Sequence, residues 1–183
     1  MNTIYDIPSW EGIYGVTKEG DVWSYPRQER HSGTHVRNRK GRWLKPCKKA
    51  RGYLQFVLQC GGRKEYSNIH RILGIVFLGC RHGDYVDHID GDTSNNSLGN
   101  LRVCTPLQNQ WNSKPRKGSY SKFKGVYFLK NSGKWRAGIR IHGKQRHLGV
   151  FATELEAAKA YEDVAKDIHG EFFRSSLSLP SSD

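Results

Sequence analysis

Four residues between positions 85 and 112 have side chains that could hydrolyse a phosphodiester bond with the help of a metal ion. Asp87 and His88 are adjacent, and two amides follow at Asn100 and Asn109. Such hydrolysis needs a base that deprotonates water and a hard cation that neutralises charge at phosphorus and at the departing 3′ oxygen. A neutral histidine, whose ordinary pKa is about 6.5, can accept the proton. Carboxylate and amide oxygens are ligands that Mg²⁺ accepts.

The elements expected around Asp87 and His88 can aim both side chains at one site. These residues end a predicted strand, and neighbouring strand residues face opposite sides of a sheet. They can therefore serve one site only where the strand ends or twists. A loop rich in Asp and Asn over residues 90–96 follows at once and provides that ending.

A helix is expected to begin after Thr105. Threonine is a good N-cap, Pro106 suits the first helical position, and Gln108 completes a capping box with Thr105. This arrangement places Asn109 in the first helical turn. The N-terminus of a helix also favours a nearby phosphate group.

Residues 86–112 resemble the HNH endonuclease motif in the His-Asn-Asn variant of phage and intron-encoded homing endonucleases, whose fold is a ββα-metal finger. The resemblance implies that His88 is the general base and that Asp87 and Asn109 hold one Mg²⁺ or Mn²⁺. It also implies that Asn100 braces the loop that orients the histidine. Asn109 stands where the stricter pattern has a final histidine, which favours a hard metal over Zn²⁺.

Two neighbouring features suggest other roles. The acidic loop that begins at Asp90 has the spacing of an EF-hand, but Asn95 replaces the glycine at position six and Leu101 the glutamate at position twelve. An Asx turn is therefore expected in place of a calcium site. Upstream, residues 68–73 resemble the apolar lead-in helix of the same family, in which His70 is expected to be structural.

The charge of the chain points to a polyanionic partner. The formal net charge is +13 in 183 residues. Residues 27–71 contain thirteen Lys and Arg against two Glu, and residues 113–147 contain eleven and no acid. Neither segment has the continuous amphipathic pattern of a membrane-surface helix, and both contain aromatic residues. Double-stranded DNA is therefore the expected partner, without a membrane.

The four cysteines show no C-x-x-C spacing, and no apolar stretch approaches the length of a membrane span or signal peptide. These features predict a reduced, intracellular protein that is not secreted. With the phage-type resemblance, they place it in the cytoplasm of an infected bacterial cell. The cysteines are interpreted as small core residues, and structural zinc from scattered cysteines stays open.

The N-terminal region predicts a β-hairpin followed by basic chain. Residues 10–17 and 20–24 alternate apolar and polar residues around a turn, and resemble the NUMOD4 module that precedes HNH domains in phage homing nucleases. A long basic loop with strand character near Trp43 should follow from Arg27 to Arg51. The predicted domains are a NUMOD4-like module over 1–52 and a nuclease domain over 53–112, with its ββα core at 85–112. Within the second, residues 53–59 and 64–68 predict a strand pair.

The C-terminal region predicts three short strands and one amphipathic helix. A basic linker over 113–122 leads to strands from Phe123, and Thr153 with Glu156 forms a capping box for a helix that ends at Gly170. The helix should cover the back of the sheet. Residues 123–174 resemble the AP2 DNA-binding domain, and a tail over 175–183 completes the chain.

In the AP2 family the three-stranded sheet enters the major groove of DNA. The resemblance implies DNA contacts from Lys124, Tyr127, Lys134, Trp135, Arg136, Arg140, Arg146 and His147. Tyr127 and His147 depart from the usual residues, so the family's target sequence does not carry over. Strand alternation puts Arg136 and Arg140 on one face and Trp135 on the other, unless a bulge turns it.

Together these features predict an α+β protein of small modules: an N-terminal hairpin region, a ββα-metal finger and a three-stranded sheet on one helix. The expected function is that of a phage-type HNH homing endonuclease that acts as a monomer and nicks duplex DNA to leave a 5′ phosphate and a 3′ hydroxyl. Two alternatives stay open. One is a DNA-binding regulator with a catalytically silent finger, and the other is a nonspecific HNH nuclease.

Overall fold

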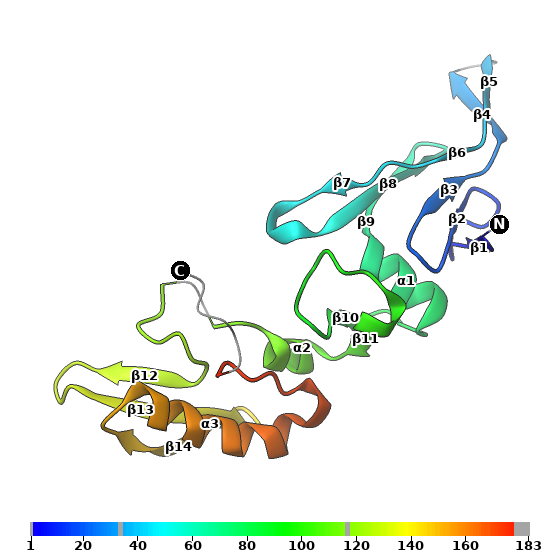
Figure 1. Ribbon diagram of the computed structural model, residues 1–183. Helices are drawn as coiled ribbons and strands as arrows, with labels where there is room; N and C mark the ends of the chain where they lie inside the picture. Colours follow the sequence, from blue (N-terminus) through cyan, green and yellow to red (C-terminus); the bar gives the residue numbers. More distant parts are fainter. Residues whose placement is uncertain (1, 33–34, 116–117, 178–183) are drawn as a thin grey trace. The chain divides into compact units, whose positions relative to one another are not determined.

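The computed structural model describes residues 2–32, 35–115 and 118–177, and it divides into an N-terminal unit (residues 1–109) and a C-terminal unit (residues 110–183) (Figure 1). Both units consist of small antiparallel sheets with few helices. This confirms the predicted α+β class. No helix in the described part of the chain is long and apolar enough to cross a lipid bilayer.

The first sheet contains the hairpin predicted from the N-terminal alternation. Its strands, in spatial order, are β1 (Tyr5–Asp6), β2 (Tyr14–Val16), β3 (Val22–Ser24) and β6 (Arg42–Trp43). β2 and β3 pair antiparallel across a turn in which Gly20 has a φ of 90°. Trp10 and Tyr14 are buried, whereas Trp23 is half-buried and packs edge-on against Trp43.

The basic region that was expected to be mainly loop contains a second hairpin. β4 (Arg27–Ser32) and β5 (His35–Arg39) pair antiparallel. Glu29 Oε1 lies 2.7 Å from Arg27 Nε, and Glu29 Oε2 lies 2.9 Å from Arg39 Nε. Burial alone would raise the pKa of Glu29, but the two arginines lower it below its ordinary value. The loop prediction is wrong for these residues. A strand is recognised in a sequence by apolar residues at every second position, and these two strands carry mainly charged and polar residues instead.

A second three-stranded sheet leads into the first helix. Its strands are β7 (Cys47–Lys48), β8 (Leu54–Cys60) and β9 (Arg63–Asn68), with the short 3-10 helix η1 (Ala50–Gly52) before β8. The predicted strand pair is present, and Gly61 and Gly62 make the turn with positive φ. α1 (Ile69–Phe77) follows directly, and Ile72 and Leu73 are buried on the core side of this helix.

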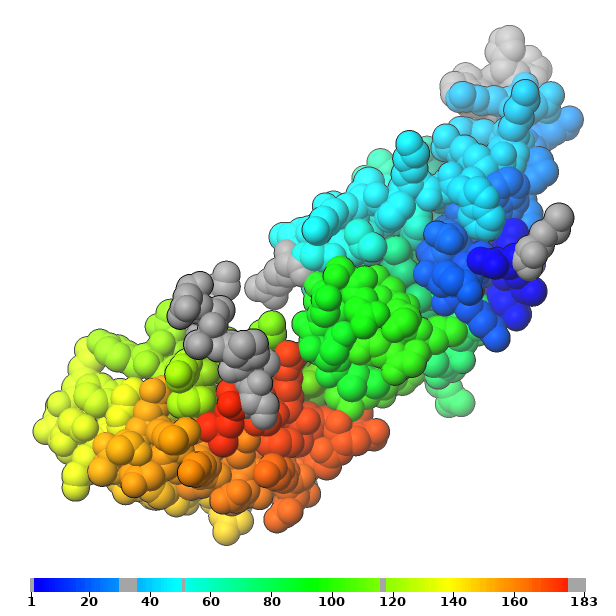
Figure 2. Space-filling model, viewed as in Figure 1, coloured from blue at the N-terminus to red at the C-terminus, as the bar shows by residue number. Residues whose placement is uncertain are grey.

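The segment after α1 has the ββα order expected of the nuclease finger. Its elements are β10 (Tyr85–His88), the 3-10 helix η2 (Leu98–Asn100), β11 (Leu101–Cys104) and α2 (Pro106–Asn112). Val86 and Leu101 pack into the same hydrophobic cluster as Val16 and Leu58. In Figure 2 the green surface of this segment lies directly against the blue and cyan surface of the preceding strands. The two modules predicted for residues 1–112 therefore share one core.

The C-terminal unit has the predicted three-stranded sheet on one helix. Its elements are β12 (Val126–Leu129), β13 (Lys134–Ile141), β14 (Lys144–Phe151), α3 (Glu154–His169) and the 3-10 helix η3 (Gly170–Phe172). β13 lies in the middle of the sheet, and α3 runs across one face of it (Figure 1). The capping box of Thr153 and Glu156 is present, and α3 ends at Gly170. Ala137 and Ile139 of β13 are buried on the side that faces α3.

Both segments that flank this unit are partly packed against it. Residues 116 and 117 of the predicted linker and residues 178–183 of the predicted tail lie outside the described residues. Ser121 is buried, and its hydroxyl donates to Glu154 Oε1 at 2.8 Å. The backbone N–H groups of Ser176 and Leu177 donate to Glu162 Oε1 at 2.6 and 3.0 Å. The buried carboxylate of Glu162 therefore holds the start of the tail.

Candidate active site

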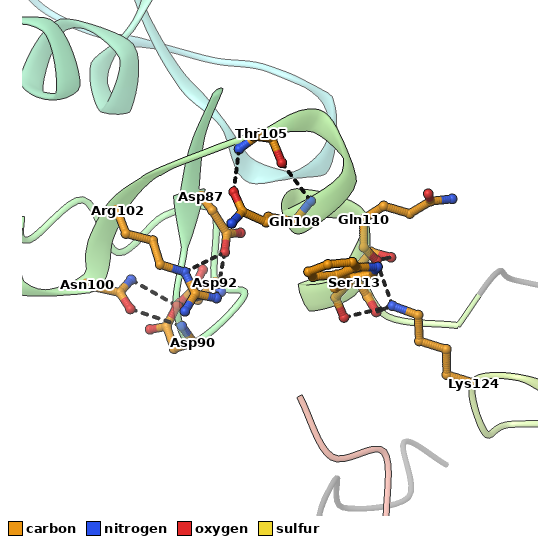
Figure 3. A network of polar contacts seen from close by, with 11 residues as sticks. Asp87, Asp90, Asp92, Asn100, Arg102, Thr105, Gln108, Gln110, Ser113 and Lys124 are labelled. Carbon is orange, nitrogen blue, oxygen red and sulfur yellow. Dashed lines mark hydrogen bonds and ion pairs between the residues drawn. The ribbon is translucent and has the colours of Figure 1, made fainter. Parts of the chain in front are cut away.

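Asp87 and His88 end β10 and are both buried, with 6% and 4% of their surfaces exposed. The register of β10 and β11 sets Asp87 directly opposite Arg102. Asp87 Oδ2 accepts two hydrogen bonds from this guanidinium, from Nε at 3.0 Å and from Nη2 at 2.9 Å (Figure 3). The ring of His88 lies near two other rings, those of His70 and Tyr53. Arg102 could not be predicted as a partner of Asp87 from the sequence, because this pairing depends on strand register.

The imidazole of His88 is oriented by Asn96. His88 Nε2 lies 3.1 Å from Asn96 Oδ1, and the Asn96 amide nitrogen donates to the carbonyl of Ser94 at 3.2 Å. Because Oδ1 can only accept, Nε2 must carry the hydrogen, which places the basic lone pair of a neutral imidazole on Nδ1. Nδ1 is thus the atom that would accept a proton. The Asn95-Asn96 pair is visible in the sequence, but a loop position does not reveal which amide turns inward.

Asn100 lies at the centre of the loop that precedes β11. Its Oδ1 accepts from the backbone N–H of Asp90 at 3.0 Å, and its Nδ2 donates to Asp90 Oδ1 at 2.9 Å (Figure 3). The same Nδ2 also donates to the Asn95 carbonyl at 2.8 Å. The backbone N–H of Ile89 donates to the Asn100 carbonyl at 2.8 Å, which ties the loop to the residue after His88. These bonds make the loop a closed network adjacent to the histidine.

The acidic side chains of this loop accept hydrogen bonds from backbone N–H groups of the same loop. Asp90 Oδ1 accepts from the N–H of Asp92 at 2.8 Å, the Asx turn expected here, and Asp92 Oδ1 accepts from Ser94 N at 2.9 Å. Burial alone would raise the pKa of Asp90, but hydrogen bonds from Asp92, Asn95 and Asn100 lower it. The carboxylates are therefore engaged as turn acceptors.

The first turn of α2 is capped as the sequence predicts. The N–H of Thr105 donates to Gln108 Oε1 at 2.8 Å, and the N–H of Gln108 donates to Thr105 Oγ1 at 3.2 Å (Figure 3). The N–H of Asn109 donates to the Thr105 carbonyl at 3.0 Å. The capping box therefore fixes the backbone from which the Asn109 side chain projects.

A cavity of about 550 Å³ lies beside these elements in the N-terminal unit. It is lined by Tyr53, Asn68, His70, Arg71, His82, Gly83, Asp84, Tyr85, Val86 and Asn109. Asn109 thus shares a cavity with His70, whose ring centroid is 5.0 Å from that of His88.

His70 is buried at the wall of this cavity. Burial, together with the nearby His88 and Arg71, lowers the pKa of His70 to about 4, so the ring is neutral near pH 7. Within the described residues, His70 Nδ1 is a buried side-chain atom with no hydrogen-bond partner. The ring also packs against Tyr53, with centroids 5.2 Å apart.

The donor atoms fit a hard divalent cation better than zinc. Within the described ranges, no group of three or more His, Cys, Asp and Glu side chains is placed to hold a metal ion. Asp87 has a carboxylate and Asn109 an amide, and their oxygens are donors of the kind that Mg²⁺ accepts. Burial raises the pKa of Cys104 to about 11, which opposes a zinc thiolate. Cys80 and Cys104 are buried as predicted, whereas Cys47 is exposed.

Five of the residues predicted to contact DNA lie on the sheet face opposite α3. Tyr127 pairs with Arg136 across β12 and β13, and His147 pairs with Gly138 across β13 and β14. Lys134, Arg136 and Arg140 alternate along β13, and their side chains are exposed. The guanidinium of Arg136 lies over the ring of Tyr127, 5.3 Å from its centroid. This face is basic and carries an aromatic side chain.

The other three residues lie elsewhere in the C-terminal unit. Trp135 is half-buried on the α3 side, where it packs against Phe128 with ring centroids 4.9 Å apart. Arg146 is exposed but pairs with Ile139, whose side chain faces α3. The bulge between β13 and β14 lies at Ala137 and Gly138 and does not turn Trp135 outward.

Lys124 contacts main-chain carbonyls at the end of α2. Its Nζ donates to the carbonyls of Gln110 at 2.6 Å, Trp111 at 2.8 Å and Ser113 at 3.3 Å (Figure 3). Burial, together with Arg174, lowers the pKa of Lys124 to about 8. Trp135 and Lys124 thus make contacts within the C-terminal unit, and DNA contact by Trp135, Lys124 and Arg146 stays a prediction.

Two family profiles match the N-terminal unit and α2. A profile described as HNH endonuclease matches residues 68–111, and one described as NUMOD4 motif matches residues 5–59. The first match spans Asp87, His88, Asn100 and Asn109. The second covers the N-terminal sheet and the β4–β5 hairpin.

Several viral proteins are similar to the chain. It is 37% identical to Protein 3.8 of Escherichia phage T7 over 92 residues, which cover 50% of this chain and 75% of that protein. It is 36% identical to Uncharacterized HNH endonuclease L560 of Acanthamoeba polyphaga mimivirus over 88 residues, 48% of this chain and 44% of that protein. It is 33% identical to DNA endonuclease I-HmuI of Bacillus phage SP01 over 112 residues, 61% of this chain and 57% of that protein.

A solved structure concerning DNA binding and cleavage by the HNH homing endonuclease I-HmuI is also similar, with a TM-score of 0.47 and 33% sequence identity. The match covers 59% of this chain and 55% of that one. The chain thus spans most of the T7 protein and less than two thirds of I-HmuI and of the mimivirus protein.

Proposed function

Because the chain belongs to the HNH endonuclease family, we propose that it is a phage-type homing endonuclease that nicks duplex DNA near a preferred site. The observation that carries the proposal is the orientation of His88. Asn96 accepts the Nε2 hydrogen, so the basic lone pair of the neutral ring is on Nδ1, and Asp87 is the residue before His88 in β10. A base so oriented next to a hard oxygen ligand suits hydrolysis.

Asp87 and Asn109 would hold one Mg²⁺ or Mn²⁺. When bound, the cation neutralises the negative charge that develops on the phosphate and on the departing 3′ oxygen. Asp87 projects from the end of β10 and Asn109 from the capped first turn of α2, so both ligands come from short, hydrogen-bonded elements. Asn100 closes the loop between the strands and keeps His88 in place.

In the proposed reaction, His88 Nδ1 takes a proton from a water molecule as the water oxygen attacks phosphorus. The bond between phosphorus and the 3′ oxygen breaks in line with the attack, and the 3′ oxygen takes up a proton from solvent. The products are a 5′ phosphate and a 3′ hydroxyl. One chain provides one such site, so a monomer cuts one strand and a double-strand break needs two chains.

The outer face of the C-terminal sheet is the proposed DNA-targeting surface. It presents Tyr127, Lys134, Arg136, Arg140 and His147 on the side opposite α3. Arginines on one face of a strand can reach base edges or phosphates together, as in an AP2-like sheet in the major groove. Such an enzyme would act on phage or host DNA in the cytoplasm of the infected bacterial cell.

Nicking of supercoiled plasmid tests the proposal. Wild type and His88→Ala are each assayed with Mg²⁺, with Mn²⁺ and with EDTA, and His142→Asn, at an exposed turn of the other unit, serves as a histidine control. We expect metal-dependent nicking by wild type and the control, and none by His88→Ala. Tight DNA binding without cutting under any metal would instead identify a DNA-binding regulator with a silent finger.

Mapping of the cut positions on a long duplex distinguishes a homing endonuclease from a nonspecific HNH nuclease. The homing interpretation predicts one preferred position, and it predicts that the preference weakens when Arg136 and Arg140 are replaced by Gln. Cuts spread along the duplex, with the same distribution in that double variant, would identify a nonspecific nuclease.

A further inference from the structure

Arg102 is a partly buried cation that already bonds the carboxylate proposed to hold the metal. Two of its N–H groups converge on one oxygen, Asp87 Oδ2, at 3.0 and 2.9 Å (Figure 3). The side chains of Arg102 and Asp87 are only 14% and 7% exposed. Little water therefore screens this pair, unlike the pair of Arg63 and Glu65, whose side chains are 53% and 42% exposed.

A divalent cation at Asp87 must either share the carboxylate with the guanidinium or displace it. Sharing brings two positive charges within a few ångströms in a poorly screened site, where their repulsion is strong. Displacement leaves a partly buried guanidinium without this carboxylate, which also costs free energy. Both routes weaken metal binding as long as the metal ion and the guanidinium depend on the same Asp87 carboxylate.

A DNA phosphate would relieve this conflict. It brings negative charge and oxygen acceptors to the metal, and a guanidinium binds phosphate with the same planar pair of N–H groups that it uses for carboxylate. The metal ion could then bind Asp87 while the guanidinium of Arg102 binds the phosphate. If Arg102 stays in place, the negative charge of the phosphate would reduce the repulsion between the guanidinium and the metal ion.

We propose that Arg102 couples metal binding to DNA binding: it holds Asp87 in position and keeps cation affinity low until a phosphate group arrives. Arg102 acts through Asp87 and is a positioning residue. The inference rests on the proposed function, in which Asp87 is a metal ligand. It assigns to that site a regulation that the endonuclease activity alone does not require, namely protection of the unbound enzyme from loading metal.

Calorimetric titration with Mn²⁺, with and without a duplex, tests the coupling. The titrations use the full chain with His88→Ala, which prevents cleavage and leaves Asp87 and Asn109 in place. Arg102→Gln removes the positive charge but keeps an N–H donor for Asp87. Without DNA, we expect this variant to bind Mn²⁺ roughly tenfold tighter, the change that about 1.4 kcal/mol of removed repulsion produces.

The effect of DNA should shrink in the same variant. Binding couplings are reciprocal, so the factor by which DNA raises Mn²⁺ affinity equals the factor by which Mn²⁺ raises DNA affinity. Both factors should be smaller in Arg102→Gln than in the parent protein. Arg102→Lys keeps the positive charge, so both factors should be close to those of the parent. Arg63→Met removes a positive charge from an exposed ion pair in the same unit. It should change neither the Mn²⁺ affinity nor the coupling between Mn²⁺ and DNA binding.

Two results would overturn the inference. Unchanged or weaker Mn²⁺ binding by folded Arg102→Gln without DNA would show that the guanidinium does not oppose the metal. A DNA-dependent gain equal to that of the parent would show that Arg102 carries no coupling. Asp87→Asn separates this failure from failure of the proposed function: if it binds Mn²⁺ as the parent does, Asp87 is no ligand and the metal site itself is wrong.

Discussion

The ammonium group of Lys124 donates a hydrogen bond to the main-chain carbonyl of Trp111 at 2.8 Å. It also bonds the carbonyls of Gln110 and Ser113, so a single cation satisfies three acceptors at the C-terminal end of α2. The indole of Trp111 stacks on His169 with centroids 4.6 Å apart and planes 15° apart. Residues 110–113 are therefore bonded to other residues of the C-terminal unit.

Lys124→Met should destabilise the C-terminal unit by about 1–3 kcal/mol, because three main-chain carbonyls lose a charged hydrogen-bond donor. Hydrogen exchange of the amides of β13 and α3 measures the effect. Lys159→Met is the matched control, since Lys159 is exposed on α3. If Lys124→Met leaves exchange unchanged and weakens DNA binding instead, Lys124 is the DNA contact that the AP2 resemblance implies.

Arg136→Gln should weaken DNA binding without changing stability beyond about 0.5 kcal/mol, because the side chain is exposed on the outer face of β13. If Arg136 neutralises one phosphate, the slope of log K against log salt concentration should fall by about 0.9. Fluorescence anisotropy at several salt concentrations measures this slope. Lys159→Gln, on the helix side of the unit, should leave the slope unaltered. Equal losses of DNA affinity in Arg136→Gln and Lys159→Gln would show that DNA does not bind the outer face of the sheet.

Thr105→Ala should cost about 1 kcal/mol of stability and also reduce nicking. The hydroxyl caps the N–H of Gln108, and the turn that it closes carries the proposed metal ligand Asn109. Urea unfolding and plasmid nicking provide the two measurements. Thr105→Ser keeps the capping oxygen and should behave nearly as wild type. A nicking rate that is unchanged in a destabilised Thr105→Ala protein would argue against a role of this turn in metal binding.

His70 should make the N-terminal unit sensitive to acid. Its pKa is lowered from 6.5 to about 4 in the folded protein, so the unfolded chain takes up the proton first as pH falls. The contribution of neutral His70 to the free energy of unfolding is therefore complete above about pH 6.5. It declines between about pH 6.5 and pH 4, by about 1.4 kcal/mol per pH unit at most.

Hydrogen exchange of α1 and β8 between pH 7 and pH 5 measures this decline. His70→Gln should be less stable than wild type at pH 7 but should lose less stability on acidification. His82→Gln replaces an exposed histidine of the same unit and should follow the wild-type pH dependence. A parallel pH dependence in His70→Gln and wild type would assign the acid sensitivity to other groups.

Elements whose signals are local could be predicted from the sequence. The capping boxes at Thr105 and Thr153 depend on residues three positions apart, and both are present. The β4–β5 hairpin was missed because its faces are charged, and the ion pairs of Glu29 with Arg27 and Arg39 form only once the strands are paired. Hydrophobic periodicity carries no information about such a strand.

The sequence by itself determined the chemical composition of the candidate site, since Asp87, His88, Asn100 and Asn109 follow from residue type and spacing. Tertiary structure alone decided their partners. The pairing of Asp87 with Arg102 depends on the register of β10 and β11, and the bond from His88 to Asn96 depends on how a loop closes. The burial of Lys124 likewise depends on contact between segments that are distant in sequence. Spacing along a chain specifies which groups are available, whereas hydrogen bonds and ion pairs require positions in space that only the packed fold provides.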